Sequence, residues 1–290
     1  MKYLYKFSII LFLVFSLQSC QQEIGNYLVV GTFNVEWLGD GTRDRIDRTE
    51  EDYKNIADII LNMDADIIGL QEIENEKALL RVLKYLPDYK SYISSGGNQQ
   101  KVALIHKSDI QINKYSEYEK LAVEENRTRP GLLVSAQKNG FKWTMLVVHL
   151  KSTSRYDNTA EKKEGSQSIR ESQAQVISDW ADSMLQNSID KNLIIVGDFN
   201  DTPKRKKNPT LQPLMENESL FFLTESLKSC KYPTWYVIDH IIVSENMLKY
   251  YEDNSLFIYD FRSQFPDYSL KMLSDHCPIT ATFKIGKGEL

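Results

Sequence analysis

The sequence has few cysteines and no Cys-x-x-Cys pair. Its 290 residues include only Cys20, Cys230 and Cys277. Three cysteines are too few for a disulfide framework, and their spacing does not suit a structural zinc site. Cys230 and Cys277 can form one disulfide in an oxidising compartment or stay as small buried side chains. The sequence leaves that choice open.

An excess of positive charge is also missing. The chain has 35 Lys and Arg against 40 Asp and Glu, a formal net charge of −5. This balance argues against a protein that coats nucleic acid or anionic lipid without specificity, but not against an enzyme that meets a polyanion in one cleft. No Pro-, Gly- or Ser-rich linker interrupts residues 27–290. We therefore expect these residues to form a single domain.

One long apolar run is present, at the N-terminus. Lys2 and Lys6 precede FSIILFLVFSL, which is too short for a stable membrane anchor and is followed by QSC. This pattern predicts an export signal over residues 1–19, and LQSC resembles the lipobox of bacterial lipoproteins. We expect lipidation at Cys20, a short tether over residues 20–26, and an exported bacterial cell-envelope lipoprotein, periplasmic or surface-exposed, that contacts the membrane through its anchor. Nothing in the sequence indicates an obligate protein partner.

The rest of the chain alternates apolar runs with helical patterns. Short alternating runs over residues 89–150 predict an antiparallel meander. A long helix follows, and its apolar residues share one face. Long buried strands, hairpins and few amphipathic helices predict an α/β (α+β) fold of two sheets packed together with helices outside. The remaining elements are strands at 27–35, 66–74, 193–200, 239–244 and 277–283, helices at 50–63, 75–85 and 209–217, and the long helix whose buried face is Ile169, Val176, Ile177, Trp180 and Met184.

Polar side chains stand at one end of six apolar strands. If these ends converge, they form a carboxylate-rich cleft with histidines, which suits a hard divalent cation. Three of the four histidines, His149, His240 and His276, lie at such ends. The polar residues are Asn34, Glu36, Glu72, His149, Asp198, Asn200, Asp239, Asp275 and His276.

The alternative to a metal-binding cleft is that these polar residues simply form turns, as the segment LIIVGDFND, residues 193–201, illustrates. Gly, Asp and Asn are common turn residues, so a turn explains this segment when it is taken alone. The other strand ends favour a reaction centre for Asp198 and Asn200. Gly197 and Asp201 keep the interpretation as turn residues.

Six motifs, in order, resemble those of the endonuclease/exonuclease/phosphatase superfamily, in its deoxyribonuclease-like branch. They are GTFNVEWL, LQEIE, VVHLKS, VGDFND, IDHIIVS and SDHCPI. The resemblance implies a four-layer sandwich of two mixed sheets packed face to face with helices on the outer faces. It also implies Mg²⁺-dependent hydrolysis of phosphate esters, with Mn²⁺ as a substitute, by in-line attack of water on phosphorus.

The same resemblance implies a metal site. Glu72 matches the principal metal-binding glutamate of the family. Asn34, Glu36 and Asp275 are expected near the ion, directly or through water.

Catalytic roles follow from the resemblance in the same way. Asp198 orients or deprotonates the attacking water, and Asn200, two residues further along an extended segment, holds a phosphoryl oxygen. His276 donates to the phosphate while Asp239 fixes its tautomer. His149 matches the second histidine of the deoxyribonuclease-like branch.

The substrate is less well indicated. Arg129 is either a phosphate contact or a solvated turn charge, and Lys204 and Arg205 begin a basic run expected at the cleft rim. Together they favour a nuclease acting on DNA, with RNA as a further substrate. Alternatives are a sphingomyelinase-like or inositol-phosphate hydrolase, although Trp37 and Trp235 are interpreted as core or rim packing and not as a lipid-binding hairpin. A non-catalytic binding lipoprotein is disfavoured because no principal motif residue is missing. Arg170 and Gln173 fit a family helix or an ordinary polar helix face.

Overall fold

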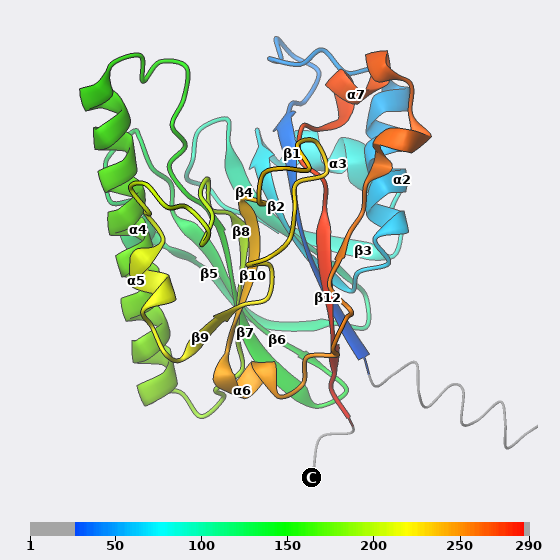
Figure 1. The fold of residues 1–290 in the computed structure, drawn as a ribbon. Coiled ribbons are helices and arrows are strands. Elements are labelled where there is room, and N and C mark those ends of the chain that lie inside the picture. Colours follow the sequence, from blue (N-terminus) through cyan, green and yellow to red (C-terminus); the bar gives the residue numbers. More distant parts are fainter. Residues whose placement is uncertain (1–26, 287–290) are drawn as a thin grey trace, which may run out of the picture.

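Two six-stranded sheets packed face to face form the centre of the molecule, with helices on both outer faces (Figure 1). The computed structural model describes residues 27–286, apart from the side chains of residues 267 and 268. The predicted four-layer sandwich is confirmed. The predicted export signal, the tether and Cys20 lie outside the described residues.

The first sheet contains the N-terminal and C-terminal strands. Its order is β11-β12-β1-β2-β4-β3, and β1 and β2 are parallel while every other pair is antiparallel. Helices α2, α3 and α7 cover its outer face (Figure 1). The elements are β1 (Tyr27–Leu38), α2 (Glu50–Asn62), β2 (Ile67–Ile73), α3 (Glu76–Leu83), β3 (Tyr89–Ile93), β4 (Lys101–Lys107), β11 (Phe257–Ile258), η2 (Phe261–Gln264), α7 (Asp267–Leu273) and β12 (Ile279–Lys284).

The second sheet is built from the middle of the chain. Its order is β5-β6-β7-β8-β10-β9, and here β7 and β8 are the parallel pair. Helices α4 and α5 cover its outer face (Figure 1). The elements are β5 (Gln111–Tyr118), η1 (Glu119–Leu121), β6 (Gly131–Lys138), β7 (Phe141–His149), α4 (Ala160–Asn187), β8 (Leu193–Asp198), α5 (Gln212–Met215), β9 (Leu220–Phe222), β10 (Asp239–Ser244) and α6 (Glu245–Leu248).

The predicted meander over residues 89–150 is wrong in its pairing. β3 and β4 join the first sheet, whereas β5, β6 and β7 join the second. The chain crosses between the sheets over residues 108–110. Alternating side chains specify a strand but not its neighbour, and β4 buries its apolar residues by pairing with β2, which lies earlier in the chain.

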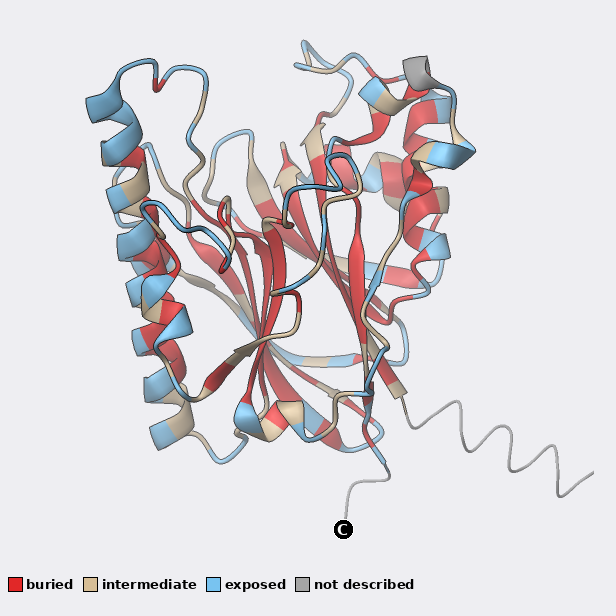
Figure 2. Ribbon diagram, in the orientation of Figure 1, coloured by how far each residue is buried: buried red, intermediate tan, exposed pale blue. Residues whose placement is uncertain are grey.

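Apolar side chains from both inner faces form the central core. Val30 and Leu104 of the first sheet pack with Val134, Val147 and Val196 of the second. Buried strands therefore occupy the middle of the molecule, and exposed residues lie on the outer helices and loops (Figure 2). No helix within residues 27–286 is both long enough and apolar enough to cross a membrane.

The helices largely follow their predicted faces. Thr49 caps α2 and shares a capping box with Asp52. On α4, Ile177 and Trp180 are buried, but Ile169, Val176 and Met184 are only half-buried. Arg170 and Gln173 occupy the buried face instead, with 2% and 0% exposure. The interpretation of these two residues as an ordinary polar face is therefore wrong.

Candidate active site

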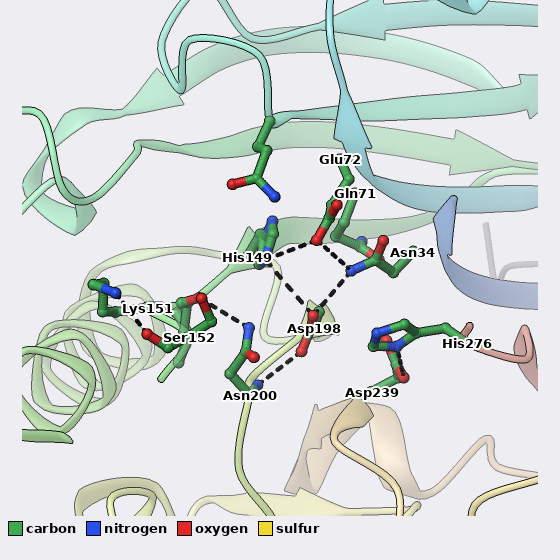
Figure 3. Close-up of polar contacts among 12 residues, drawn as sticks. Asn34, Gln71, Glu72, His149, Lys151, Ser152, Asp198, Asn200, Asp239 and His276 are labelled. Atoms are coloured by element: carbon green, nitrogen blue, oxygen red, sulfur yellow. Dashed lines mark hydrogen bonds and ion pairs between the residues drawn. The ribbon is translucent and has the colours of Figure 1, made fainter. Parts of the chain in front are cut away.

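The carboxyl ends of both parallel strand pairs meet at one edge of the sandwich. His149 at the end of β7 lies beside Asp198 at the end of β8. Asp239, at the start of the antiparallel β10, is the partner of Asp198 on its other side. Asn34 on β1 and Glu72 on β2 face this group from the first sheet (Figure 3). Parallel strands present their carboxyl ends at the same edge, so side chains distant in sequence converge here.

Asn34 joins the two sheets. Its buried amide nitrogen donates to Glu72 Oε1 over 3.3 Å and to Asp198 Oδ2 over 3.0 Å. Its amide oxygen accepts from the backbone N–H of Glu36 over 3.0 Å. One amide therefore holds two carboxylates from opposite sheets at a set separation.

Irregular backbone aims Glu72 into the site. The register of β1 with β2 shifts between Asn34 and Leu38, and that of β2 with β4 shifts between Leu70 and Ile73. Glu36, Trp37 and Glu72 have φ values of 44°, 52° and 63°. Left-handed conformations cost free energy in residues other than glycine, and bulges of this kind redirect side chains near active sites. Here the Trp37 N–H donates to Glu72 Oε2 over 3.1 Å.

His149 is held as a neutral imidazole. Arg129 donates to its Nδ1, so Nε2 carries the proton. That Nε2 lies 3.6 Å from Asp198 Oδ2 and 3.9 Å from Glu72 Oε1. Burial, with the charge of Arg129, lowers the pKa of His149 well below its ordinary value. Arg129 is thus not a solvated turn charge.

His276 has the opposite charge state. Its Nδ1 donates to Asp239 Oδ2 over 2.7 Å, and its Nε2 lies 3.7 Å from Asp275 Oδ1. Burial opposes the charge, but the carboxylates of Asp239, Asp198 and Asp275 outweigh it and raise the pKa of His276 well above its ordinary value. The imidazolium is the form present at neutral pH.

Asp198 lies between the two histidines (Figure 3). It is 2% exposed. Burial raises its pKa to about 7, with His276 lowering it and the carboxylates of Asp239 and Glu72 raising it further. A carboxyl group with this pKa exchanges a proton near neutral pH.

The residues around Asp198 differ from the expectation at two positions. Asn200 is not extended: its φ is 53°, its N–H donates to Asp198 Oδ1 over 2.8 Å, and its amide donates to the carbonyl of Leu150. The left-handed turn, and not strand alternation, brings it to the site. Gly197, expected to be a turn residue, belongs instead to β8, with φ 149°. A Cβ there would lie 1.9 Å from the carbonyl oxygen of Val148.

The carboxylates crowd at this edge. Burial raises the pKa of the Glu36 carboxyl, and the nearby charge of Asp275 raises it further. The buried Oδ1 of Asp239 has no hydrogen-bond partner among the described residues. Ligand atoms of Asp198, Asp239 and His276 lie within 4.8 Å of one another. Crowded carboxylates with an unpartnered carboxylate oxygen suit a hard divalent cation, so the acidic residues at this edge could hold one. The grouped atoms are not those of the predicted set, Glu72, Asn34, Glu36 and Asp275, and a protonated His276 would not be a ligand.

A cleft of about 750 Å³ opens beside Glu72 and Arg129. Arg129, a candidate phosphate contact from the sequence, is one of its cations; the other four lie on loops and were not predicted. Gln173 Oε1 accepts from the N–H of Lys151 over 2.8 Å, and Arg170 donates to the carbonyl of Lys151, so the buried face of α4 holds this cation in place. The cations lining the cleft are Arg45, Arg127, Arg129, Lys151 and Arg155.

Lys204 and Arg205 lie apart from this lining. Lys204 pairs with Glu225, and Arg205 pairs with the buried carboxylate of Asp201. Asp201 also accepts from Thr210, so it shapes the loop it begins, as a turn residue does. Substrate contact by the two cations stays a prediction.

A second cavity, of about 200 Å³, lies beside His276. Cys230 and Cys277 form a disulfide along its wall, with Cα atoms 6.3 Å apart. Trp235 is 65% exposed there, so of the two predicted alternatives, core or rim packing, the core is excluded and the rim remains. His240 points away from the site, since Thr224 and the carbonyl of Asp201 contact its two ring nitrogens.

The sequence profile of the Endonuclease/Exonuclease/phosphatase family matches residues 32–275. The chain belongs to this family. No curated protein sequence matches this chain.

Solved structures share the fold of this family member. A truncated TDP2 from Caenorhabditis elegans has a TM-score of 0.66 at 18% identity, over 90% of this chain and 98% of that one. A mannosyl-6-phosphatase from Bacteroides thetaiotaomicron has a TM-score of 0.62 at 16% identity, over 88% and 98%. TDP2 from D. rerio, complexed with single strand DNA product, has a TM-score of 0.63 at 14% identity, over 89% and 98%. At these identities the likeness concerns the fold alone.

Proposed function

We propose that this protein is a divalent-metal-dependent phosphodiesterase that cleaves nucleic acid, DNA and also RNA. One observation carries the choice of substrate: a cleft of about 750 Å³ lined by five cations opens at Glu72 and Arg129. Cations along a cleft bind the phosphates of a nucleic acid without reading its bases. The similar fold of a TDP2 complexed with single strand DNA product is consistent with this substrate.

The metal is Mg²⁺, for which Mn²⁺ can substitute. Glu72 would hold it, with Asn34, Glu36 and Asp275 nearby. Asn34 keeps its oxygen toward the Glu36 backbone while its nitrogen holds Glu72. When bound, the cation neutralises charge on the phosphoryl oxygens.

Asp198 is the acceptor for the proton of the attacking water. Its buried carboxyl, with a pKa of about 7, is ionised in a useful fraction of molecules at neutral pH. The new bond from the water oxygen to phosphorus forms as the bond to the leaving oxygen breaks, with no covalent enzyme intermediate. Asn200, whose N–H fixes Asp198 Oδ1 and whose amide donates to the Leu150 carbonyl, would hold a phosphoryl oxygen through its second amide hydrogen.

The two histidines supply donors to the phosphate. His276, kept protonated by Asp239, presents its Nε2–H to a phosphoryl oxygen as charge grows there. His149, kept neutral by Arg129, presents its own Nε2–H toward the same centre. One donor is charged and the other is neutral, and each is fixed by its own partner.

A small phosphoester hydrolase, inositol-phosphate or sphingomyelinase-like, is the second candidate. The cavity beside His276 holds only about 200 Å³ and has exposed aromatic residues at its wall. The similar fold of a mannosyl-6-phosphatase is also consistent with a small phosphoester as substrate.

For the nuclease, the first candidate, Lys204 and Arg205 are retained as rim contacts for the polyanion.

We also propose that the protein is exported and anchored in the cell envelope through lipid at Cys20. The apolar run followed by QSC supports this location. Globomycin treatment of expressing cells, which blocks processing of lipoprotein signals, should leave the precursor uncut. Processing that is unaffected by globomycin and by Cys20→Ser would contradict lipidation.

The substrate is tested with protein that lacks residues 1–20. It is incubated with Mg²⁺ in parallel with plasmid DNA, RNA, sphingomyelin vesicles, inositol phosphates and mannose 6-phosphate. We expect plasmid nicking and RNA cleavage that EDTA abolishes. Inert nucleic acid alongside turnover of one small ester would reverse the order of the two candidates, and activity that persists in EDTA would remove the metal from both.

A further inference from the structure

Two large aromatic side chains stand in solvent at the mouth of the cavity beside His276. Tyr232 is 48% exposed and Trp235 is 65% exposed. Their ring centroids lie 4.9 Å apart with the planes tilted by 34°. Neither ring joins a hydrophobic core. Large apolar surfaces left exposed next to a reaction centre are typical of a binding site.

The segment that carries these rings is held in place by several contacts. The Trp235 N–H donates to the Tyr232 carbonyl over 2.8 Å, and the Ser229 N–H donates to the Trp235 carbonyl over 3.0 Å. Lys228 and Tyr236 form an antiparallel bridge at its base. The rings are thus presented by a preorganised turn, which lowers the entropy cost of binding a ligand.

A covalent link ties the same segment to the reaction centre. Cys230 forms its disulfide with Cys277, the residue directly after His276. The cavity wall includes both Tyr232 and Trp235 as well as Asp239, Asp275 and His276. The aromatic rings therefore keep a set position relative to the imidazolium.

The size of this cavity limits its occupant. Its volume of about 200 Å³ is below the 300–1,000 Å³ that is usual for drug-sized ligands, so it has room for about one ring system. It shares no lining residue with the cation-lined cleft beside Glu72. The reaction centre therefore has a basic cleft on one side and an aromatic cavity on the other.

Charged groups around the rings indicate which class of ligand the cavity can bind. Lys231 Nζ lies 3.7 Å from Asp275 Oδ2, and Lys228 Nζ lies 3.2 Å from the centroid of the Tyr236 ring. An acyl chain placed among these groups would strip them of water without replacing their hydrogen bonds. A nucleobase has an aromatic face for the rings and polar edges for the charges.

We propose that Tyr232 and Trp235 form a stacking platform for one unpaired nucleobase next to the scissile phosphate. This inference rests on the proposed nuclease function. A base stacked on the platform cannot remain paired in a duplex, so the enzyme acts preferentially on single strands. The disulfide holds the platform beside His276.

The test compares two ligands that share a phosphate backbone. One is oligothymidylate, and the other is an oligomer of equal length in which every base is absent. KM and kcat are measured with Mg²⁺ for the wild type, Trp235→Ala and Trp235→Phe. Tyr115→Ala is the matched control, since Tyr115 is 57% exposed and lines neither cavity.

We expect Trp235→Ala to raise KM for oligothymidylate by roughly 5- to 100-fold, the loss usual for one stacked base. Its kcat and its KM for the base-free oligomer should stay within about twofold of wild type, and Trp235→Phe should restore most of the affinity. If Trp235→Ala raised KM equally for both oligomers, or for neither, the proposal of a stacking platform would be wrong. A defect confined to sphingomyelin vesicles would contradict it as well and would assign the rings to a lipid surface. A wild type that nicks plasmid DNA but cleaves neither oligomer would also overturn the platform, whereas one that cleaves neither the oligomers, plasmid DNA nor RNA would refute the nuclease function itself.

Discussion

Nδ2 of Asn34 donates to Oδ2 of Asp198 over 3.0 Å, although 164 positions separate the two residues in the chain. The bond runs from β1 of one sheet to the end of β8 in the other. It places the Glu72 carboxylate, which the same nitrogen contacts, at a set distance from Asp198. The candidate active site is thus assembled across the interface between the sheets, and the packing of the sheets determines its geometry.

Replacing Asn34 tests this coupling. We expect Asn34→Ala to lower kcat by about 10²-fold, because Asp198 and Glu72 lose their common donor at a preorganised site. The measurement is steady-state cleavage of a fluorescent oligonucleotide with saturating Mg²⁺. Asn187→Ala, at the exposed end of α4, is the control and should behave as wild type. An Asn34→Ala enzyme with half of wild-type kcat would contradict the coupling.

Replacing Asp198 should separate activity from stability. The pKa of about 7 in the folded protein lies above the ordinary value of 3.8, so the free energy of unfolding falls as pH rises from about 3.8 to 7, where only the folded state still holds the proton. In EDTA at pH 8, we expect Asp198→Asn to be more stable to urea than wild type, by up to about 4 kcal/mol, and less active with Mg²⁺ by about 10²–10³-fold. A variant that is both less stable and fully active would show that Asp198 is a structural group.

The buried His240 should make the fold sensitive to acid. Burial lowers its pKa from 6.5 to about 4. The stability it contributes is fully present above pH 6.5 and is lost as pH falls toward 4, because only the unfolded chain takes up the proton in that range. The loss should reach about 3 kcal/mol at pH 4. Urea unfolding of wild type and His240→Gln between pH 7 and pH 4 measures it, and parallel curves for the two proteins would refute it.

A divalent cation should stabilise the fold as well as support activity. Glu36, Glu72, Asp198, Asp239 and Asp275 gather their charge at one edge, and a bound cation relieves their repulsion. We expect Mg²⁺ or Mn²⁺ to raise Tm and EDTA to abolish cleavage. Glu72→Gln should lose most of the rise in Tm, whereas Glu161→Gln, an exposed residue at the start of α4, should keep it. An equal rise in both variants would place the cation elsewhere.

Gly197 sets the approach of β8 to β7. Its φ of 149° and the 1.9 Å that would separate a Cβ from the Val148 carbonyl leave no room for a side chain. Gly197→Ala should lower the free energy of unfolding by about 3 kcal/mol or more and displace Asp198. Gly165→Ala in α4, where nothing lies within 4 Å of the added carbon, should instead stabilise by about 0.5–1 kcal/mol. Chemical denaturation of both variants checks the contrast.

The sequence identified most elements because each leaves a local pattern. The apolar β-branched run at the N-terminus of the domain became β1, and Tyr53, Ile56 and Ile60 at helical spacing became the buried face of α2. Local patterns could not assign β4 and β5 to different sheets, because each strand alternates in the same way whatever its neighbour. Strand pairing is a long-range choice.

The same division holds for the candidate site. Asp198, Asp239 and His276 stand at strand ends in the sequence, and their convergence followed once parallel strands were assumed. Arg129 was named as a possible phosphate contact, but its contact with His149 was beyond reach. So were the other cations of the cleft, since scattered loop residues carry no periodic signal. The left-handed turn at Asn200 was likewise missed, because the side chain of Asp198 stabilises it through the Asn200 N–H.

By itself the sequence determined which residues form strands and helices and that acids, amides and imidazoles end the buried strands. Hydrophobic periodicity is a property of neighbouring residues, and a chain carries it before it folds. Only the tertiary structure decided the charge states: Arg129 keeps His149 neutral, Asp239 keeps His276 protonated, and burial brings Asp198 to a pKa of about 7. Those states depend on distance and burial, which arise only when the two sheets pack together.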